Sequence, residues 1–269
     1  MKFGVGASQL KQLTPEDAVS LASKMGFDFF QWMPIVKGEK GWAKPGQYDY
    51  DLERITALGR EAKRLNVPLL SMHLPYLPSH EVKDGFINDT VAAAKAAGAR
   101  FIIVHPLAYG NYREFFRKFY EMCRAVNLEL LLENPSAREK DIGVKIPTVS
   151  SPLQFLGLVK ESGAAVCYDC NHAIRTGLDP VDFYAMVAKF TKVLHISDAG
   201  GESNARHAPI GDGGIDFTRL FNLIRASKFN GHIVIELENS QYQELQKHLD
   251  ILKDEFSGKL ALQNMMQTN

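Results

Sequence analysis

ELLLENP, residues 129–135, is a short run of leucines that ends in a carboxylate and a proline. Five more apolar runs end in a histidine, aspartate or glutamate: LLSMHLP (69–75), FIIVHP (101–106), VCYDC (166–170), VLHIS (193–197) and IVIELE (233–238). Short apolar runs of this kind, bounded by Pro, Asn or Gly, are typical of buried parallel strands. If all six belong to one closed sheet, their carboxyl ends place the six polar side chains in a single ring. We therefore expect a metal-dependent enzyme.

A strand followed by a helix recurs eight times along the chain. Strand-like runs lie at 2–7, 27–33, 68–74, 101–106, 129–135, 164–170, 192–198 and 232–238. Amphipathic stretches follow at 15–26, 51–66, 86–98, 112–127, 150–163, 179–190, 216–230 and 241–256. Eight such units match a (β/α)8 TIM barrel, a fold that takes about 250 residues. The predicted class is therefore α/β, with residues 1–269 forming a single TIM-barrel domain.

Charge and cysteine content narrow the class of protein. Lys+Arg 31 balance Asp+Glu 31, so no overall positive field attracts nucleic acid, which favours a small-molecule substrate. The chain starts directly as a strand, and no apolar run approaches the roughly 20 residues of a membrane span. Three cysteines are too few for a disulfide scaffold. We expect a cytoplasmic protein that does not contact a membrane.

Side-chain alternation predicts which polar residues meet. Four candidate metal ligands each lie two positions after an apolar strand residue, and residues two apart on a strand share a face. These ligands are Glu133, Asp169, His195 and Glu236. Three carboxylates buried together would repel one another unless a cation neutralised them. An oxygen-rich set with one imidazole suits Mn²⁺, Mg²⁺, Co²⁺ or Zn²⁺. The sequence therefore predicts a divalent metal ion as cofactor.

Four further residues adjoin the predicted metal site. His172 comes shortly after Asp169 and is a candidate for a second metal or for a substrate hydroxyl. Arg206 and His207 precede a glycine-rich turn, and a guanidinium is a natural clamp for a carboxylate, phosphate or carbonyl. Asn134 is a candidate to orient Glu133 or to contact substrate. We expect the glycines at 211, 213 and 214 to form a tight turn, because their spacing matches no phosphate-binding motif.

The longest connections after strands lie at 34–50, 134–150 and 199–216, and we expect them to roof the site. Residues 36–51 are either a lid whose Trp42 contacts substrate or an ordinary surface loop. Cys167 and Cys170 have the spacing of a redox motif, but alternation on a strand points them to opposite faces. Structural or solvated roles are expected for Asp198, Asp212, His80, His232 and His248.

The motifs HLPY (73–76), VHP (104–106), ENP (133–135), DCNH (169–172), HISD (195–198), RHAPIGDGGIDF (206–217) and IELE (235–238) resemble the xylose isomerase-like TIM-barrel superfamily. That superfamily contains sugar and sugar-phosphate isomerases and epimerases as well as endonuclease IV. Resemblance to its ketose 3-epimerase and hydroxypyruvate isomerase branch implies that Glu133, Asp169, His195 and Glu236 hold one divalent ion. Glu133 and Glu236 would also be the acid/base catalysts that flank an enediolate. His172 and Arg206 would bind substrate oxygens of a small sugar, keto-acid or sugar phosphate.

Two alternatives remain open. Resemblance to the endonuclease IV branch implies three zinc ions, held by His73, His105, Glu133, Asp169, His172, His195, His207, Glu236 and an aspartate two positions before His207. Ala205 stands at that last position, which argues against the three-metal phosphodiesterase mechanism, although His73 and His105 could still hold a second metal beside Glu133. A barrel that binds metal without turnover is the other alternative. Barrels of this size often associate, so a homo-oligomer is also an open expectation.

Overall fold

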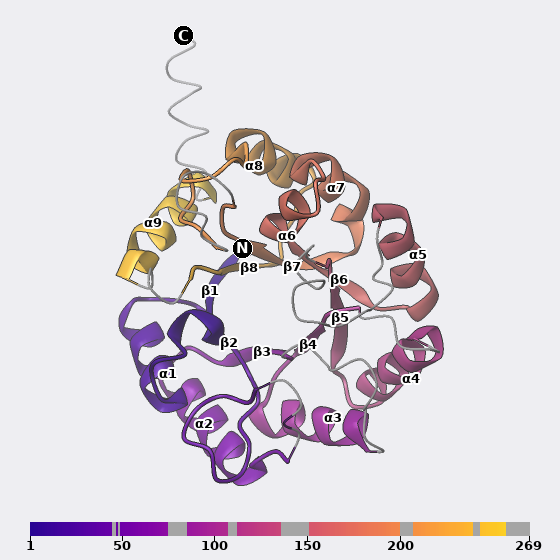
Figure 1. The fold of residues 1–269 in the computed structure, drawn as a ribbon. Helices are drawn as coiled ribbons and strands as arrows, with labels where there is room; N and C mark the ends of the chain where they lie inside the picture. The colour runs from indigo at the N-terminus through magenta and orange to yellow at the C-terminus, as the bar shows by residue number, and fades with distance from the viewer. Residues whose placement is uncertain are drawn as a thin grey trace.

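The computed structural model describes residues 1–44, 47, 49–74, 85–106, 112–135, 151–199, 207–238 and 243–256. Within them, parallel strands close into a barrel in which each strand pairs with the next and β8 pairs with β1 (Figure 1). The strands are β1 (Lys2–Gly6), β2 (Phe29–Trp32), β3 (Leu69–His73), β4 (Phe101–Val104), β5 (Glu129–Glu133), β6 (Ala165–Asp169), β7 (Thr191–Ile196) and β8 (His232–Ile235). The prediction of an α/β fold with a (β/α)8 TIM barrel is confirmed.

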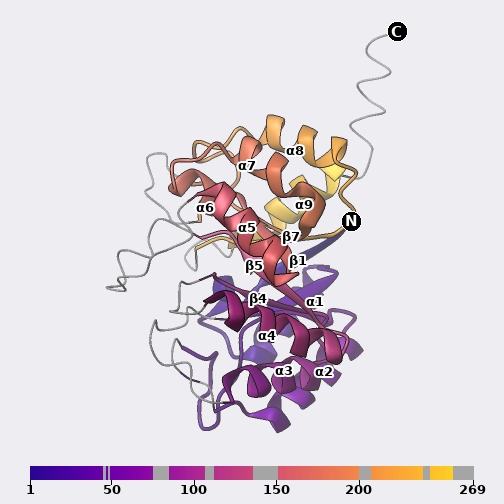
Figure 2. The same ribbon diagram turned by 90° about the vertical axis from the view of Figure 1, so that its right-hand side faces the viewer.

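Helices surround the barrel, as the end view of Figure 1 and the side view of Figure 2 show. They are α1 (Pro15–Lys24), α2 (Leu52–Arg64), α3 (Phe86–Ala97), α4 (Tyr112–Ala125), α5 (Pro152–Ser162), α6 (Cys170–Arg175), α7 (Pro180–Val187), α8 (Phe217–Ala226) and α9 (Leu245–Phe256). Short 3-10 helices lie at Ala7–Leu10 and Ala188–Phe190. Across the described segments, no helix has the length and apolar character needed to cross a bilayer.

The short helix α6 is an addition that the repeating strand and helix pattern did not predict. It begins directly after β6, where the carboxylate of Asp169 accepts a hydrogen bond from the backbone amide of His172 at 3.0 Å. An aspartate at this position satisfies an amide that the first turn of a helix leaves unpaired. The cap therefore fixes the side chain of Asp169 at the end of its strand.

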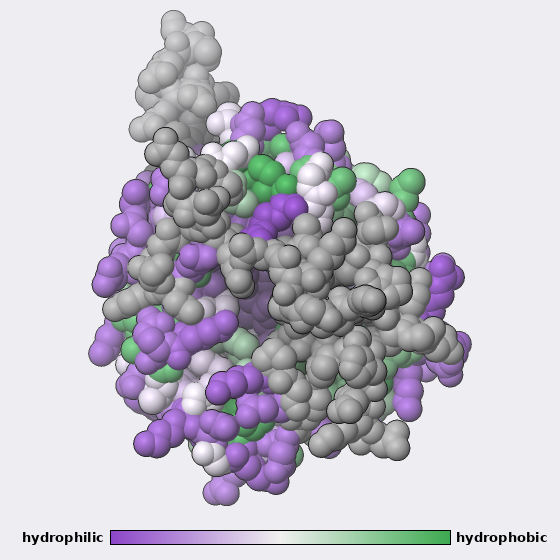
Figure 3. Space-filling view, viewed as in Figure 1, coloured by the Kyte–Doolittle hydropathy of each residue, from purple (hydrophilic) through white to green (hydrophobic). Residues whose placement is uncertain are grey.

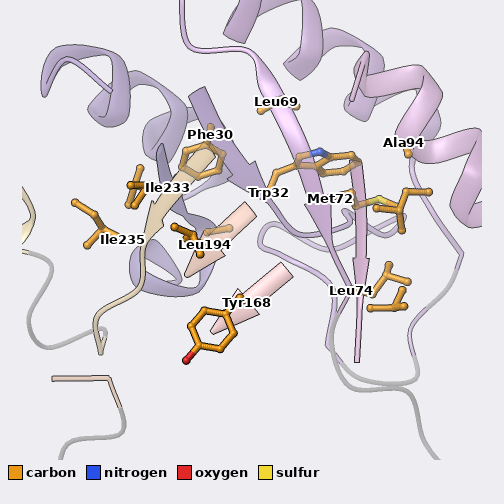
Figure 4. Close-up of a cluster of buried hydrophobic side chains, with 14 of the residues drawn as sticks. Phe30, Trp32, Leu69, Met72, Leu74, Ala94, Tyr168, Leu194, Ile233 and Ile235 are labelled. Atoms are coloured by element: carbon orange, nitrogen blue, oxygen red, sulfur yellow. The ribbon is translucent and has the colours of Figure 1, made fainter. Parts of the chain in front are cut away.

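Alternation along the strands separates two apolar clusters. Inside the barrel lie Phe29, Phe101, Ile103, Leu131, Cys167, Val193 and Val234. The alternate strand residues, such as Phe30, Leu194 and Ile233, face outward into the larger cluster under the helices (Figure 4). The predicted opposite orientations of Cys167 and Cys170 are confirmed, since the first belongs to the inner cluster and the second to the outer one. Two residues beyond the inner cluster, the same face carries polar side chains.

The connection after β2 packs onto the barrel wall. Trp42 is 8% exposed, and its indole stacks on the outward-facing ring of Phe30, with ring centroids 5.9 Å apart. Val36 and Tyr50 form an antiparallel bridge that closes the base of this loop. Trp42 is therefore a core residue of the loop. Of the other long connections, residues 136–150 and 200–206 lie outside the described residues.

Candidate metal centre

The predicted ligands converge at the carboxyl end of the barrel. The carboxyl ends of four consecutive strands carry these ligands: Glu133 and Asp169 end β5 and β6, His195 is the penultimate residue of β7, and Glu236 directly follows β8. One ligand atom from each of the four lies within 4.8 Å of all the others. His195 Nδ1 lies 3.0 Å from Glu133 Oε1 and 3.4 Å from Glu236 Oε1. Figure 3, viewed onto this end, shows hydrophilic residues near the centre of the face. The structure thus brings together the four residues that the sequence grouped.

These four side chains are buried, which makes their charge costly. Glu133, Asp169 and His195 are 0% exposed and Glu236 is 4% exposed. Among the described residues, Asp169 Oδ2 accepts no hydrogen bond, and Glu133 Oε2 accepts none of good geometry although two histidine nitrogens lie within 3.3 Å of it. Burial raises the pKa of Asp169, and the charges of Glu133 and Glu236 raise it further, against the opposing effect of nearby histidines. A divalent cation fits this donor set because it would satisfy the unpaired oxygen of Asp169 and offset the repulsion among the three carboxylates.

Histidines keep Glu133 ionised despite its burial. Desolvation alone would raise the pKa of Glu133, but the positive charges of His105, His195 and His73, when these are protonated, hold it well below its ordinary value; near neutral pH, where His105 is neutral, His195 supplies this charge. Burial also acts against ionisation of Glu236, and its pKa is nevertheless lowered, with His195 the strongest opposing influence. Both glutamates are therefore carboxylates near neutral pH. A carboxylate in this form can accept a proton or bind a metal.

His73 and His105 form a second group around the other oxygen of Glu133. Their Nε2 atoms lie 2.8 and 3.3 Å from Glu133 Oε2 and 3.2 Å from each other. Burial lowers the pKa of His105 to about 3, so its imidazole is neutral at ordinary pH. Neutral imidazole is the form that binds metals. The three side chains can share an ion, with Glu133 reaching both groups through different oxygens.

Asn134 holds the end of β6. Its side-chain amide donates to the carbonyl of Asp169 at 2.8 Å, and its carbonyl oxygen accepts from the amide of Asp169 at 2.7 Å. The backbone carbonyl of Asn134 accepts from His172 Nδ1 at 3.0 Å, which leaves His172 Nε2 3.6 Å from Asp169 Oδ2. Asn134 thus orients Asp169, whereas the sequence suggested Glu133 as the residue it would orient. Contact of Asn134 or His172 with a substrate stays a prediction.

His207 borders the site on the side of β7. Its Nδ1 lies 3.0 Å from Ser197 Oγ, and its ring centroid is 5.8 Å from that of His172. Burial lowers the pKa of His207. The structure therefore places both histidines beside Asp169. Arg206 and the altered position Ala205 lie outside the described residues.

Gln31 is a site residue that the sequence analysis missed. It is the penultimate residue of β2, is 1% exposed, and its Nε2 donates to Glu236 Oε1 at 3.0 Å. Its Oε1 accepts from Ser71 Oγ at 3.2 Å and lies 3.0 Å from His195 Nε2. A carboxylate can only accept, so the Gln31 amide has one orientation, and His195 Nε2 must carry the proton it donates to Oε1. His195 consequently presents Nδ1 to the three carboxylates. The only sequence signal was one amide in the apolar run FDFFQWM.

Two of the residues expected to be structural, Asp198 and His248, form hydrogen bonds that hold a turn, whereas His80 lies outside the described residues. The carboxylate of Asp198 accepts from four backbone amides that shape the glycine-rich turn: Ala199, Gly211, Gly213 and Ile215. A Cβ at Gly213 would lie 2.3 Å from Asp198 Oδ1, which explains the glycine there. His248 accepts from the amide of Ile210 at 2.9 Å. The turn is therefore held by Asp198, and its tight-turn interpretation agrees with the structure.

With this geometry in place, comparison with known proteins gives the family. The family model described as "Xylose isomerase-like TIM barrel" matches residues 19–255. The chain belongs to this family. The uncharacterized protein Rv0498 of Mycobacterium tuberculosis is 22% identical over 94% of this chain and 95% of its own length.

Solved structures share the barrel. A D-tagatose 3-epimerase-like protein superposes with a TM-score of 0.72 at 20% identity, covering 96% of this chain and 97% of that one. D-Psicose 3-epimerase from Clostridium cellulolyticum H10, solved with D-tagatose, gives a TM-score of 0.71 at 15% identity, with 93% and 98% covered. At these identities the likeness establishes the fold.

Proposed function

We propose that the protein, acting as a single barrel domain, is a divalent-metal-dependent epimerase or isomerase of a small sugar, keto-acid or sugar phosphate. The observation that carries the proposal is the convergence of three buried carboxylates and the Nδ1 of His195 within 4.8 Å. Gln31 directs that nitrogen into the cluster. Histidines are the ion-pair partners of these carboxylates among the described residues, which supports a cation as the additional counter-charge. The likeness to 3-epimerases supports a sugar substrate.

Glu133, Asp169, His195 and Glu236 would hold the metal, which would polarise a substrate carbonyl and its neighbouring hydroxyl. Glu133 and Glu236 come from strands on different sides of the cluster, and both are ionised near neutral pH. One glutamate takes the proton from the carbon next to the carbonyl. The other, or the same one, returns a proton to the opposite face or to the neighbouring carbon. Gln31 holds one oxygen of Glu236, so the transferred proton belongs to its other oxygen.

Substrate oxygens have partners around this centre. We assign their binding to His172 and His207, which lie together beside Asp169, to Asn134, and, from the sequence alone, to Arg206. These groups supply donors and acceptors to hydroxyls and, through the guanidinium of Arg206, to a phosphate or carboxylate. Mn²⁺, Zn²⁺, Mg²⁺ and Co²⁺ all suit the donor set, and metal analysis of the purified protein identifies the native one.

The test is exchange of the carbon-bound substrate proton with D₂O in the Mn²⁺-loaded protein, using D-tagatose, D-psicose and D-fructose. Glu236→Gln should keep the fold and lower exchange by about a hundredfold or more, because it removes the proton acceptor. The matched control is Glu121→Gln on the exposed face of α4, which should exchange at the wild-type rate. Wild-type exchange by Glu236→Gln would remove this residue from catalysis.

A second candidate is a metal-dependent phosphodiesterase with an additional metal. The observation in its favour is the pair His73 and His105 on Glu133 Oε2. Metal stoichiometry and incision of duplex DNA carrying an abasic site decide between the two. Two or three zinc ions per chain with efficient incision and no ketose turnover would favour the phosphodiesterase. Bound metal with neither activity would identify a non-catalytic barrel.

A further inference from the structure

Gly6, the last residue of β1, stands where a side chain would enter the mouth of the barrel. It pairs with Gln31, whose side chain faces inward, and residues paired across parallel strands share a face. Its φ of −87° and ψ of 146° are extended values that any residue adopts. Backbone conformation therefore does not require a glycine at this position. The reason must lie in the space that the missing side chain leaves.

That space is taken by the amide of Gln9. A Cβ built on Gly6 would lie 2.6 Å from Gln9 Oε1 and 3.4 Å from Glu236 Oε1. Gln9 belongs to the 3-10 helix Ala7–Leu10 that follows β1, so its side chain folds back over the end of its own strand. The absence of a side chain at Gly6 thus lets a glutamine amide reach the position beside Glu236.

The amide of Gln9 is only partly satisfied. Gln9 is 2% exposed, and its Nε2 donates to Ser8 Oγ at 2.6 Å. Its Oε1 has no hydrogen-bond partner among the residues that the structure describes. A buried acceptor without a donor is costly, and such groups are rare unless a ligand or water completes them. With Nε2 directed to Ser8, the carboxylate of Glu236 cannot pair with Gln9 Oε1, because both of these oxygens only accept.

We propose that Gln9 Oε1, in the space left by Gly6, is a hydroxyl-binding subsite that accepts a hydrogen bond from a substrate hydroxyl group next to Glu236. The proposal rests on the proposed function and deepens it. Gln9 selects polyhydroxylated substrates that carry a hydroxyl at one defined carbon, and Gly6 is the positioning residue that admits the amide. A substrate lacking that hydroxyl leaves the acceptor unpaired, which is how such sites discriminate.

Two variants test the subsite. Gln9→Leu keeps the volume and removes the amide, whereas Gly6→Ala keeps Gln9 but places a methyl group where its Oε1 lies. The displaced atom is the far end of a flexible side chain, so Gly6→Ala should fold normally. The matched control is Gln246→Ala on the exposed face of α9, where the amide only donates to Asp250.

The assay compares kcat/KM for the best substrate among D-tagatose, D-psicose and D-fructose with kcat/KM for its monodeoxy analogues. Both variants should lower kcat/KM about tenfold on the parent ketose, the effect of one lost hydrogen bond. One deoxy analogue lacks the hydroxyl that Gln9 binds. For that analogue alone, wild type and both variants should have the same low kcat/KM. If Gly6 or Gln9 had a purely structural role, the substitutions would lower kcat/KM equally for all ketoses and all analogues.

The outcomes separate this subsite from the proposed function. Ketose turnover by wild type with unchanged kcat/KM in Gln9→Leu refutes the subsite and leaves the epimerase intact. The subsite is also refuted if the variants lose the same factor in kcat/KM on every analogue. If wild type turns over no ketose, calorimetric binding of D-glucitol to the Mn²⁺-loaded protein decides. Binding weakened about tenfold in both variants, but not in Gln246→Ala, supports a hydroxyl subsite on a protein with another activity. The subsite is refuted if wild type and all variants bind D-glucitol with equal affinity, or if wild type does not bind it.

Discussion

Replacing Gln31 by methionine tests whether this amide organises the metal centre. Gln31→Met keeps the length of the side chain but removes its donor to Glu236 and its acceptor for His195 and Ser71. The Nε2–H of His195 then loses its acceptor, and Glu236 Oε1 loses its amide donor and, among the described residues, keeps only His195 Nδ1 at 3.4 Å. Each unsatisfied group costs about 1–3 kcal/mol, and costs within one network are not additive. We expect the free energy of unfolding of the metal-free protein to fall by about 2–4 kcal/mol.

The same substitution should weaken metal binding. Without the acceptor at Gln31, His195 is no longer held with its proton on Nε2 and its Nδ1 toward the carboxylates. Loss of such an orienting partner lowers metal affinity by about 10- to 100-fold. Urea unfolding measures the first effect and Mn²⁺ titration calorimetry the second, with Gln246→Met on the surface of α9 as control.

A glutamate at position 31 restores the acceptor for His195. Gln31→Glu can still accept from His195 Nε2 and adds a negative charge beside the cluster, so its Mn²⁺ affinity should exceed that of Gln31→Met. The argument fails if Gln31→Met binds Mn²⁺ within about twofold of wild type and unfolds at the same urea concentration. That result would show that neighbouring strands alone orient His195.

Three further predictions concern metal, turn and core. Burial lowers the pKa of His195, but Cys167, Glu236 and Glu133 together raise it well above its ordinary value. Protonation of His195 therefore stabilises the metal-free fold, and this stabilisation is lost as the pH rises through the raised pKa. Because Mn²⁺ must displace this proton to bind His195, the increase in Tm that Mn²⁺ causes should be larger at about pH 8 than at about pH 6. An increase in Tm that does not depend on pH would contradict the prediction. Asp198→Asn should cost about 2–4 kcal/mol in urea unfolding, because four amides lose a charged acceptor; less than about 1 kcal/mol would refute it. Gly4→Ala, whose Cβ would lie 2.3 Å from the ring of Phe29, should cost about 1–3 kcal/mol, whereas Gly157→Ala, with open space around it, should not destabilise.

The sequence predicted the residues whose position depends on strand ends alone. Glu133, Asp169 and His195 end apolar runs, and once the runs are parallel strands of one barrel their ends must meet. Gln31 could not be found this way, because its partners lie on β3, β7 and β8, up to 205 residues away. Only closure of β8 onto β1 brings Glu236 within reach of β2.

Local sequence was also silent about side-chain partners in loops and at strand ends. Trp42 sits in a polar segment and was expected to contact substrate or solvent, yet it stacks on Phe30, an outward residue of the neighbouring strand. Asn134 follows Glu133 and was expected to orient it or to contact substrate, but its amide reaches Asp169 across the sheet. In both cases the partner is set by which strand lies alongside, a tertiary feature.

The two oxygens of Glu133 link the number of metals to the mechanism. Oε1 faces His195 and the main cluster, whereas Oε2 faces His73 and His105. With one metal bound through Oε1, Oε2 is free to take a proton, and Glu133 and Glu236 can serve opposite faces of a substrate carbon. With a second metal on Oε2, both oxygens of Glu133 are coordinated, which withdraws electron density and makes this carboxylate a weaker proton acceptor. Inversion at carbon by two bases is therefore favoured when His73 and His105 hold no metal, whereas a two-metal protein would depend mainly on Glu236 as the base.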